Sequence, residues 1–202
     1  MFDAALRRLL DPSLDRIGAE MARAGISANS VTATGFAIGL CAVPALALGL
    51  TGLAVACIAL NRLLDGLDGP VARHAGASDL GGFLDIVADF IFYSAVPFGL
   101  ALADPGTNAL AGAFLIFSFV GSGSSFLAYA AIAAKRGLHS SARGRKSFYY
   151  LGGLLEGAET IVFLLFIAAF PHWFAPAAWI FGALCWLSTA GRVAIAVQSF
   201  RR

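Results

Sequence analysis

Four aspartates in the first half of the chain have the spacing of a metal-binding cluster. Asp65 and Asp68 are three residues apart, and Asp85 and Asp89 are four apart. In a helix either spacing places both side chains on one face. Four carboxylates in one cavity cannot all ionise without cations, and hard oxygen ligands suit Mg²⁺ or Mn²⁺. The spacing therefore predicts that all four aspartates hold two divalent ions.

The composition shows what kind of elements must position these acids. Of the 202 residues 59% are hydrophobic and only 13% are charged, which excludes an ordinary soluble domain. The net charge of +2 is too small to indicate a nucleic-acid partner. The three cysteines, Cys41, Cys57 and Cys185, lie in apolar runs without metal-type spacing and are interpreted as buried apolar residues.

Apolar runs of the length of a membrane-spanning helix recur along the chain. A bilayer core of about 30 Å requires roughly 20 apolar residues per helix, and no alternating strand pattern is present. The sequence thus predicts an all-α integral membrane protein. Its six spans are expected at Ser30–Leu50, Leu53–Ala72, Leu80–Ala103, Ala109–Ala134, Tyr149–Phe170 and Pro176–Val197. The acids lie in the second and third spans, where a charge at mid-membrane costs at least about 2.5 kcal/mol.

The first 29 residues have a different character. Leucine and other apolar residues recur there at helical spacing, and charged residues cover the remaining surface. This pattern predicts an amphipathic helix on the membrane surface, and the alternative is a solvated helix at the interface with a partner protein. Residues 1–29 are therefore assigned to this juxtamembrane helix and its cap, and residues 30–202 to a six-helix catalytic domain.

The basic residues predict the orientation. All 14 lysines and arginines are assigned to one face, with Arg62 and Arg73 placed at the end of the second span. The loops on the opposite face, near residues 49–52, 104–108 and 171–175, contain none. The positive-inside rule then places both termini and the acidic cluster in the cytoplasm.

The aspartates belong to a longer pattern, Asp65-x-x-Asp68-Gly69-x-x-Ala72-Arg73 followed by Gly81-x-x-x-Asp85-x-x-x-Asp89. This pattern resembles the signature of the CDP-alcohol phosphotransferases, and all of its fixed positions are filled. The resemblance extends to the six spans, the short amphipathic helix and the segment Ile26–Thr32 before the first span.

The resemblance implies an enzyme of phospholipid biosynthesis. Such an enzyme transfers a phosphatidyl group from CDP-diacylglycerol to an alcohol and releases CMP. By the family pattern the acids hold the metals, and Asp89 serves as the catalytic base. The nucleotide would be bound by Asp68, Gly69, Ala72, Arg73 and Gly81. The family also suggests a homodimer, and the bacterial inner membrane is the expected location.

Basic residues on the same side as the acids suggest the acceptor. Their charge favours a phosphorylated alcohol, with glycerol 3-phosphate ahead of inositol phosphate. The alternative is that the cluster only fixes topology and contacts anionic lipids. The candidate acceptor-binding residues are Lys135, Arg143, Arg145, Lys146 and Arg192.

Two other functions compete with catalysis. A small cation transporter would also use buried acids, but it would need polar groups across the whole membrane, and these acids gather on one side. A purely structural subunit would leave the four carboxylates unexplained.

Overall fold

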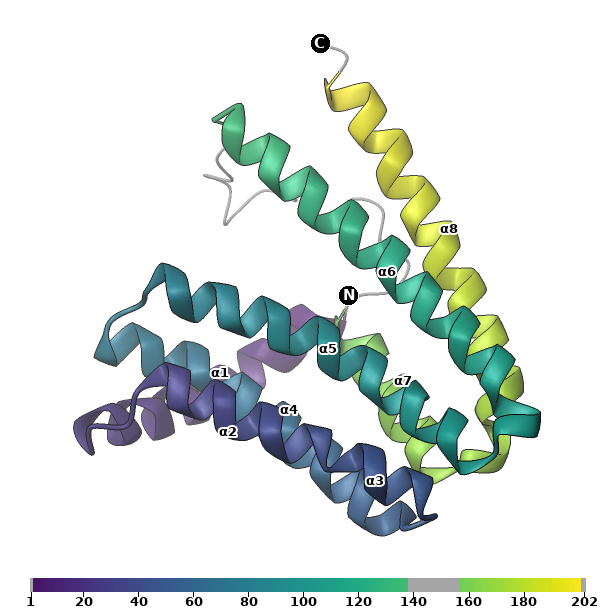
Figure 1. Cartoon of the computed structure of the whole chain (residues 1–202). Coiled ribbons are helices and arrows are strands. Elements are labelled where there is room, and N and C mark those ends of the chain that lie inside the picture. The colour runs from purple at the N-terminus through teal and green to yellow at the C-terminus, as the bar shows by residue number, and fades with distance from the viewer. Residues whose placement is uncertain (1, 138–156, 201–202) are drawn as a thin grey trace.

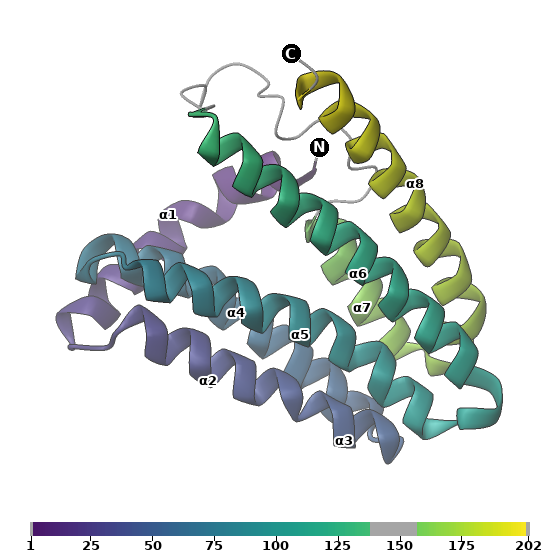
Figure 2. The same ribbon diagram turned by 45° about the horizontal axis from the view of Figure 1, so that its top comes forward.

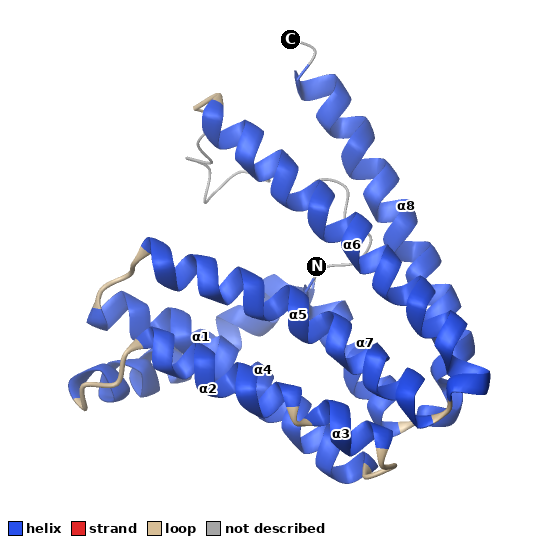
Figure 3. Cartoon of the chain, in the orientation of Figure 1, coloured by secondary structure: helices blue, strands red, loops and turns tan. Residues whose placement is uncertain are grey.

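The computed structural model describes residues 2–137 and 157–200, with side chains from Pro12 onward. Within that part of the chain, all regular structure is helical (Figure 3). The elements in order are α1 (Phe2–Arg23), α2 (Ala28–Leu40), α3 (Ala42–Ala47), α4 (Thr51–Ala75), α5 (Asp79–Ala103), α6 (Pro105–Lys135), α7 (Gly157–Ala169), the 3₁₀ turn η2 (Pro171–Trp173) and α8 (Phe174–Phe200). The prediction of an all-α protein is confirmed.

Four helical segments of the described residues are long and apolar enough to cross a membrane. They are Ala28–Ala47, Asp79–Ala103, Pro105–Lys135 and Pro171–Phe200. α4 has 25 residues but carries the charges of the acidic motif, and α7 is a shorter apolar helix of 13 described residues. The expectation that α4 and α7 also span the bilayer, giving six spans, stays a prediction.

Local signals set the helix ends next to the acids. Ser27 caps α2 by accepting a hydrogen bond from the Ser30 amide at 3.2 Å, and Ser78 caps α5 by accepting one from the Gly81 amide at 3.1 Å. Gly76 caps the C-terminus of α4, and its φ of +103° is in the region that favours glycine. This turn brings α5 back antiparallel to α4, so that both acidic pairs lie at the same end of the bundle.

The helices form a three-helix layer and a diverging pair (Figures 1 and 2). α2 packs against both α4 and α5, and α3 continues α2. α6 and α8 lie side by side and lean away from α5 toward the end that carries Lys135 and Phe200. The main core joins both parts through fully buried Phe92, Leu115 and Phe174.

α1 packs against α4, the helix that carries the first acidic pair. It continues through Pro12. A β-carbon on Gly18 would lie 2.5 Å from Cβ of Pro70 and 2.9 Å from the Pro70 carbonyl carbon. The two backbones therefore approach more closely than any other residue at position 18 would permit. The prediction that α1 also lies on a membrane surface remains a prediction.

Candidate metal and nucleotide site

Three of the four predicted aspartates converge. Asp65 and Asp68 from α4 and Asp85 from α5 each offer a carboxylate oxygen, and these oxygens all lie within 4.8 Å of one another. Asp68 is buried at 8% exposure, and the other two are half-buried. The i, i+3 spacing and the antiparallel turn at Gly76 together produce this arrangement.

The chemistry of this oxygen set fits a hard divalent cation. Mg²⁺ binds oxygens at about 2.1 Å, so opposite ligands in its shell are about 4.2 Å apart, and small side-chain adjustments bring the three carboxylates into range. Like charges this close repel one another unless a cation neutralises them. Asp65, Asp68 and Asp85 are therefore the residues of this cluster that would hold Mg²⁺ or Mn²⁺.

Asp89 lies beside this group but has a different partner. Its Oδ1 accepts a hydrogen bond from Nη1 of Arg62 at 2.8 Å. Its Oδ2 has a long contact of 3.5 Å with the Tyr93 hydroxyl. Asp89 is thus not among the three carboxylates that converge, and the proposal that it is both a metal ligand and the base remains a prediction.

Arg62 is a site residue that the sequence analysis missed. The prediction that Arg62 lies at the end of the second span is wrong. Arg62 lies near the middle of α4, and its side chain is only 9% exposed. Nη1 is also 3.5 Å from Oδ2 of Asp65. The sequence signal that could have identified Arg62 is its spacing from Asp65, because residues three apart on a helix lie on the same face.

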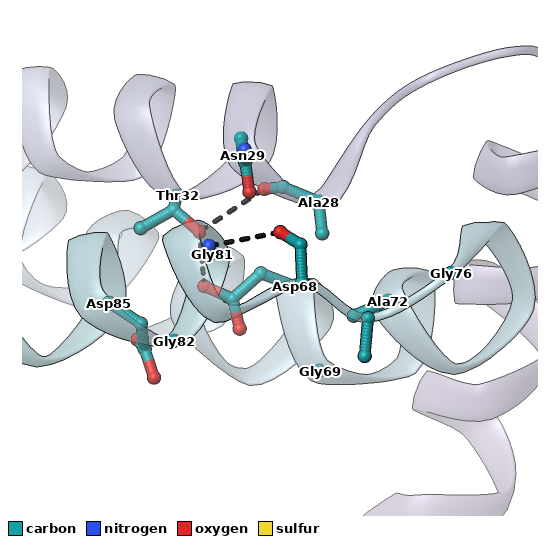
Figure 4. A pocket seen from close by; sticks show the side chains of 12 residues that line it. Ala28, Asn29, Thr32, Asp68, Gly69, Ala72, Gly76, Gly81, Gly82 and Asp85 are labelled. Atoms are coloured by element: carbon teal, nitrogen blue, oxygen red, sulfur yellow. Dashed lines mark hydrogen bonds between the residues drawn. The ribbon is translucent and has the colours of Figure 1, made fainter.

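A pocket of about 230 Å³ opens next to the acids (Figure 4). Four of the predicted nucleotide-binding residues line it, namely Asp68, Gly69, Ala72 and Gly81. Asp85 also lies on its wall, so the pocket is continuous with the candidate metal site. A phosphate in this pocket would lie against small side chains that leave the helix backbone accessible.

The start of α2 supplies two further pocket residues that the sequence analysis did not assign. Thr32 donates a hydrogen bond from Oγ1 to Oδ2 of Asp68 at 2.7 Å (Figure 4). A β-carbon on Gly81 would lie only 2.8 Å from Oδ1 of Asn29, so the Asn29 side chain lies directly against this glycine. Both residues lie in the segment Ile26–Thr32 that contributed to the family resemblance.

Arg73 does not line this pocket and instead bonds to α1. Its Nη2 donates to Oδ1 of Asp15 at 2.9 Å and its Nε to the same oxygen at 3.3 Å. The hydrogen bond from Arg73 lowers the pKa of Asp15, with a further contribution from His74 at 3.4 Å. The predicted phosphate donor therefore bonds to α1 at the edge of the site.

The predicted acceptor-binding residues are only partly described. Arg143, Arg145 and Lys146 lie outside the described residues. Lys135 is exposed at the end of α6. Arg192 is half-buried between α8 and α6, where its Nη1 donates to the Ser122 carbonyl at 2.7 Å and to Oγ of Ser125 at 2.8 Å.

Comparison with known proteins places the chain in a family. The sequence profile of the CDP-alcohol phosphatidyltransferases matches residues 25–194. The inner membrane protein YnjF of Escherichia coli is 53% identical over 193 residues, which are 96% of this chain and 94% of that protein. An archaetidylinositol phosphate synthase of Pyrococcus horikoshii is 39% identical over 98 residues, about half of each chain.

Solved structures share the fold. A phosphatidylinositol phosphate synthase of Mycobacterium tuberculosis with CDP-DAG bound has a TM-score of 0.56 and 24% identity, covering 92% of this chain and 90% of that one. A structure of the same enzyme with manganese and citrate has a TM-score of 0.56 and 23% identity, covering 92% and 86%. The profile match spans the acidic motif and the residues that line the pocket, and on this evidence the chain belongs to the CDP-alcohol phosphatidyltransferase family.

Proposed function

We propose that this protein transfers a phosphatidyl group from CDP-diacylglycerol to a phosphorylated polyol and releases CMP. The convergence of Asp65, Asp68 and Asp85 beside the pocket carries the proposal. Divalent ions held there, when bound, would neutralise the pyrophosphate and stabilise the departing CMP. Whether the cluster holds two ions, as the sequence predicts, is a question that Mn²⁺ titration answers.

The residues around the pocket have distinct roles in this reaction. The nucleotide phosphates lie against Gly69 and Gly81, while the acyl chains remain in lipid beside the bundle. Asp89 removes the proton from the acceptor hydroxyl, and the hydroxyl oxygen bonds to the lipid phosphorus. The bond from that phosphorus to the CMP oxygen breaks, so atoms and charge balance without a covalent enzyme intermediate.

The proposed acceptor is a phosphorylated alcohol. The basic residues predicted near the site favour a phosphorylated alcohol over serine, because a phosphate matches arginine and lysine without a second clamp for an ammonium group. The 39% identity to an archaetidylinositol phosphate synthase supports inositol phosphate. We therefore favour inositol phosphate as the acceptor. The sequence alone favoured glycerol 3-phosphate.

The reaction takes place at the inner face of the cell membrane in this proposal. The 53% identity to an E. coli inner membrane protein and the apolar helices support the membrane. The clustering of basic residues supports a cytoplasmic site. A homodimer, suggested by the family, remains a prediction.

The decisive experiment measures CMP release by the purified protein in lipid nanodiscs. CDP-diacylglycerol is supplied with Mg²⁺ or Mn²⁺ and one of several acceptors: inositol phosphate, glycerol 3-phosphate, inositol or serine. We expect turnover with a phosphorylated polyol, loss of turnover with EDTA, and recovery with added Mn²⁺. Asp85→Asn should lower turnover by about 100-fold or more, because it removes one metal-ligand charge.

The control is Asp104→Asn, since asparagine can keep the cap that Asp104 provides to the Thr107 amide at the far end of the bundle. Turnover that survives EDTA would overturn the metal-dependent mechanism. Turnover with serine or inositol but with neither phosphorylated alcohol would overturn the proposed acceptor class.

A further inference from the structure

Tyr93 places a phenol hydroxyl next to the acids, on the side of α5 that packs against α6. Its hydroxyl oxygen lies 3.3 Å from Nη1 of Arg62 and 3.5 Å from Oδ2 of Asp89. Its ring centroid lies 6.5 Å from that of Phe119 on α6. The residue is half-buried and does not line the nucleotide pocket. Tyr93 therefore borders the acidic cluster on a side away from that pocket.

The acceptor alcohol has to approach from a side other than the nucleotide pocket. The attacking and leaving oxygens of a phosphoryl transfer lie roughly in line, on opposite sides of phosphorus. In the proposed function CMP leaves into the pocket formed by α2, α4, α5 and the turn between α4 and α5 (Figure 4). α6 also packs against α5, and none of its described residues lines that pocket. Arg192, a predicted acceptor-binding residue, bonds to the Ser122 carbonyl of α6. We therefore expect the acceptor on the side of α5 that carries Tyr93.

The partners of the Tyr93 hydroxyl decide where its proton points. A guanidinium has donors but no acceptor, so Arg62 donates to the phenol oxygen and cannot receive the phenol proton. The proton therefore points away from Arg62, toward Oδ2 of Asp89. This contact of 3.5 Å is longer than an ordinary hydrogen bond between two oxygens, which is at most about 3.0 Å. The phenol proton is thus available to an oxygen of a bound molecule.

We propose that Tyr93 is a specificity-determining residue that donates a hydrogen bond to a second oxygen of the acceptor, next to the hydroxyl that reacts. The inference rests on the proposed function. Asp89 and Tyr93 are four residues apart and lie on one face of α5. Two hydroxyls on neighbouring carbons of a polyol can therefore meet these two side chains together. An acceptor without the second hydroxyl leaves the phenol proton unpaired.

The inference predicts a preference for polyols that depends on one oxygen atom. The wild type should use the phosphorylated polyol about tenfold better, in kcat/KM, than an analogue that lacks the neighbouring hydroxyl. Tyr93→Phe keeps the ring and its packing but removes the donor, so this preference should fall to less than about threefold. The KM for CDP-diacylglycerol should change by less than about threefold, because Tyr93 does not line the nucleotide pocket.

The test compares two acceptors in the same CMP-release assay in nanodiscs. One is the phosphorylated polyol that the wild type accepts, and the other is its analogue without the hydroxyl next to the reacting one. For glycerol 3-phosphate this analogue is 3-hydroxypropyl phosphate, and for inositol phosphate it is the corresponding monodeoxy inositol phosphate. Thr51→Val is the control, because it removes a hydroxyl about 20 Å along α4 from Asp65 and should change neither acceptor's kinetics.

The outcomes separate this inference from the proposed function. The wild type decides the proposed function, and a failure to turn over any phosphorylated polyol overturns both. With turnover established, the role of Tyr93 is overturned if the wild type uses the polyol and its deoxy analogue equally well. It is also overturned if Tyr93→Phe retains the wild-type preference. A purely structural role of Tyr93 predicts that the variant loses activity toward both acceptors by the same factor, which leaves their ratio unchanged.

Discussion

At the scale of single residues, the candidate site depends on neutral groups that hold the carboxylates. Thr32 donates to Oδ2 of Asp68 from a different helix, and Asp68 is the most buried of the converging acids. A hydrogen bond of 2.7 Å to a carboxylate fixes which oxygens remain free for a cation. The geometry of the metal ligands is therefore set partly by residues outside the aspartate pattern.

Thr32→Val tests this dependence while keeping the shape of the side chain. We expect Mn²⁺ affinity and turnover to fall by about 10-fold to 100-fold, as is usual when a partner of a metal ligand is lost. Thr32→Ser retains the hydroxyl and should recover most of both. Mn²⁺ binding and CMP release measure the effect, and equal behaviour of the valine and serine variants would show that the hydroxyl has no role.

At the scale of elements, α1 is held to the motif helix by close packing and an ion pair. Gly18 lies against the backbone at Pro70, and Asp15 pairs with Arg73 one turn further along. Because Asp15 and Arg73 are both partly exposed, the ion pair itself adds little stability. The close approach at Gly18 is the stronger constraint on where α1 lies.

Gly18→Ala should displace α1 from α4. The added methyl group meets backbone atoms that cannot rotate away, so we expect a loss of about 1–3 kcal/mol of stability and a lower unfolding temperature in detergent. Gly52→Ala is the matched control, because a β-carbon there meets nothing within 4 Å and alanine favours the helix. If the two variants unfold at the same temperature, the contact between Gly18 and Pro70 does not constrain α1.

At the scale of the whole molecule, the acidic end of the bundle should face the cytoplasm. α2 and α5 begin at that end, and α4 and α6 end there. Arg23, Arg73 and Arg136 lie at the C-terminal ends of α1, α4 and α6. The opposite turn between α5 and α6 carries Asp104 and no basic residue. This asymmetry is the physical basis of the predicted orientation.

Impermeant thiol labelling of intact cells tests the orientation. In a background with the three native cysteines replaced by alanine, Gly106→Cys should react from outside and Ala24→Cys only after the membrane is opened. Both positions are exposed. The reverse pattern would place the acids outside the cell and would contradict a cytoplasmic supply of CDP-diacylglycerol.

Much of this architecture is already present in the local sequence. Apolar length and helical periodicity predict membrane helices, and spacings of three and four place each acidic pair on one helix face. The short segment between the pairs requires α4 and α5 to be antiparallel neighbours. These local rules predict that the two acidic pairs lie close together, and the family signature contains the same residues.

The remaining features depend on how the helices rotate and approach one another. The contact of Thr32 with Asp68 joins residues 36 positions apart, and the pairing of Asp89 with Arg62 joins residues 27 apart. Arg73 bonds to α1 because Gly18 lets that helix approach α4. No local spacing encodes these distances. The sequence therefore determined which residues form the acidic site, and only the tertiary structure decided which three aspartates converge and which one bonds to an arginine.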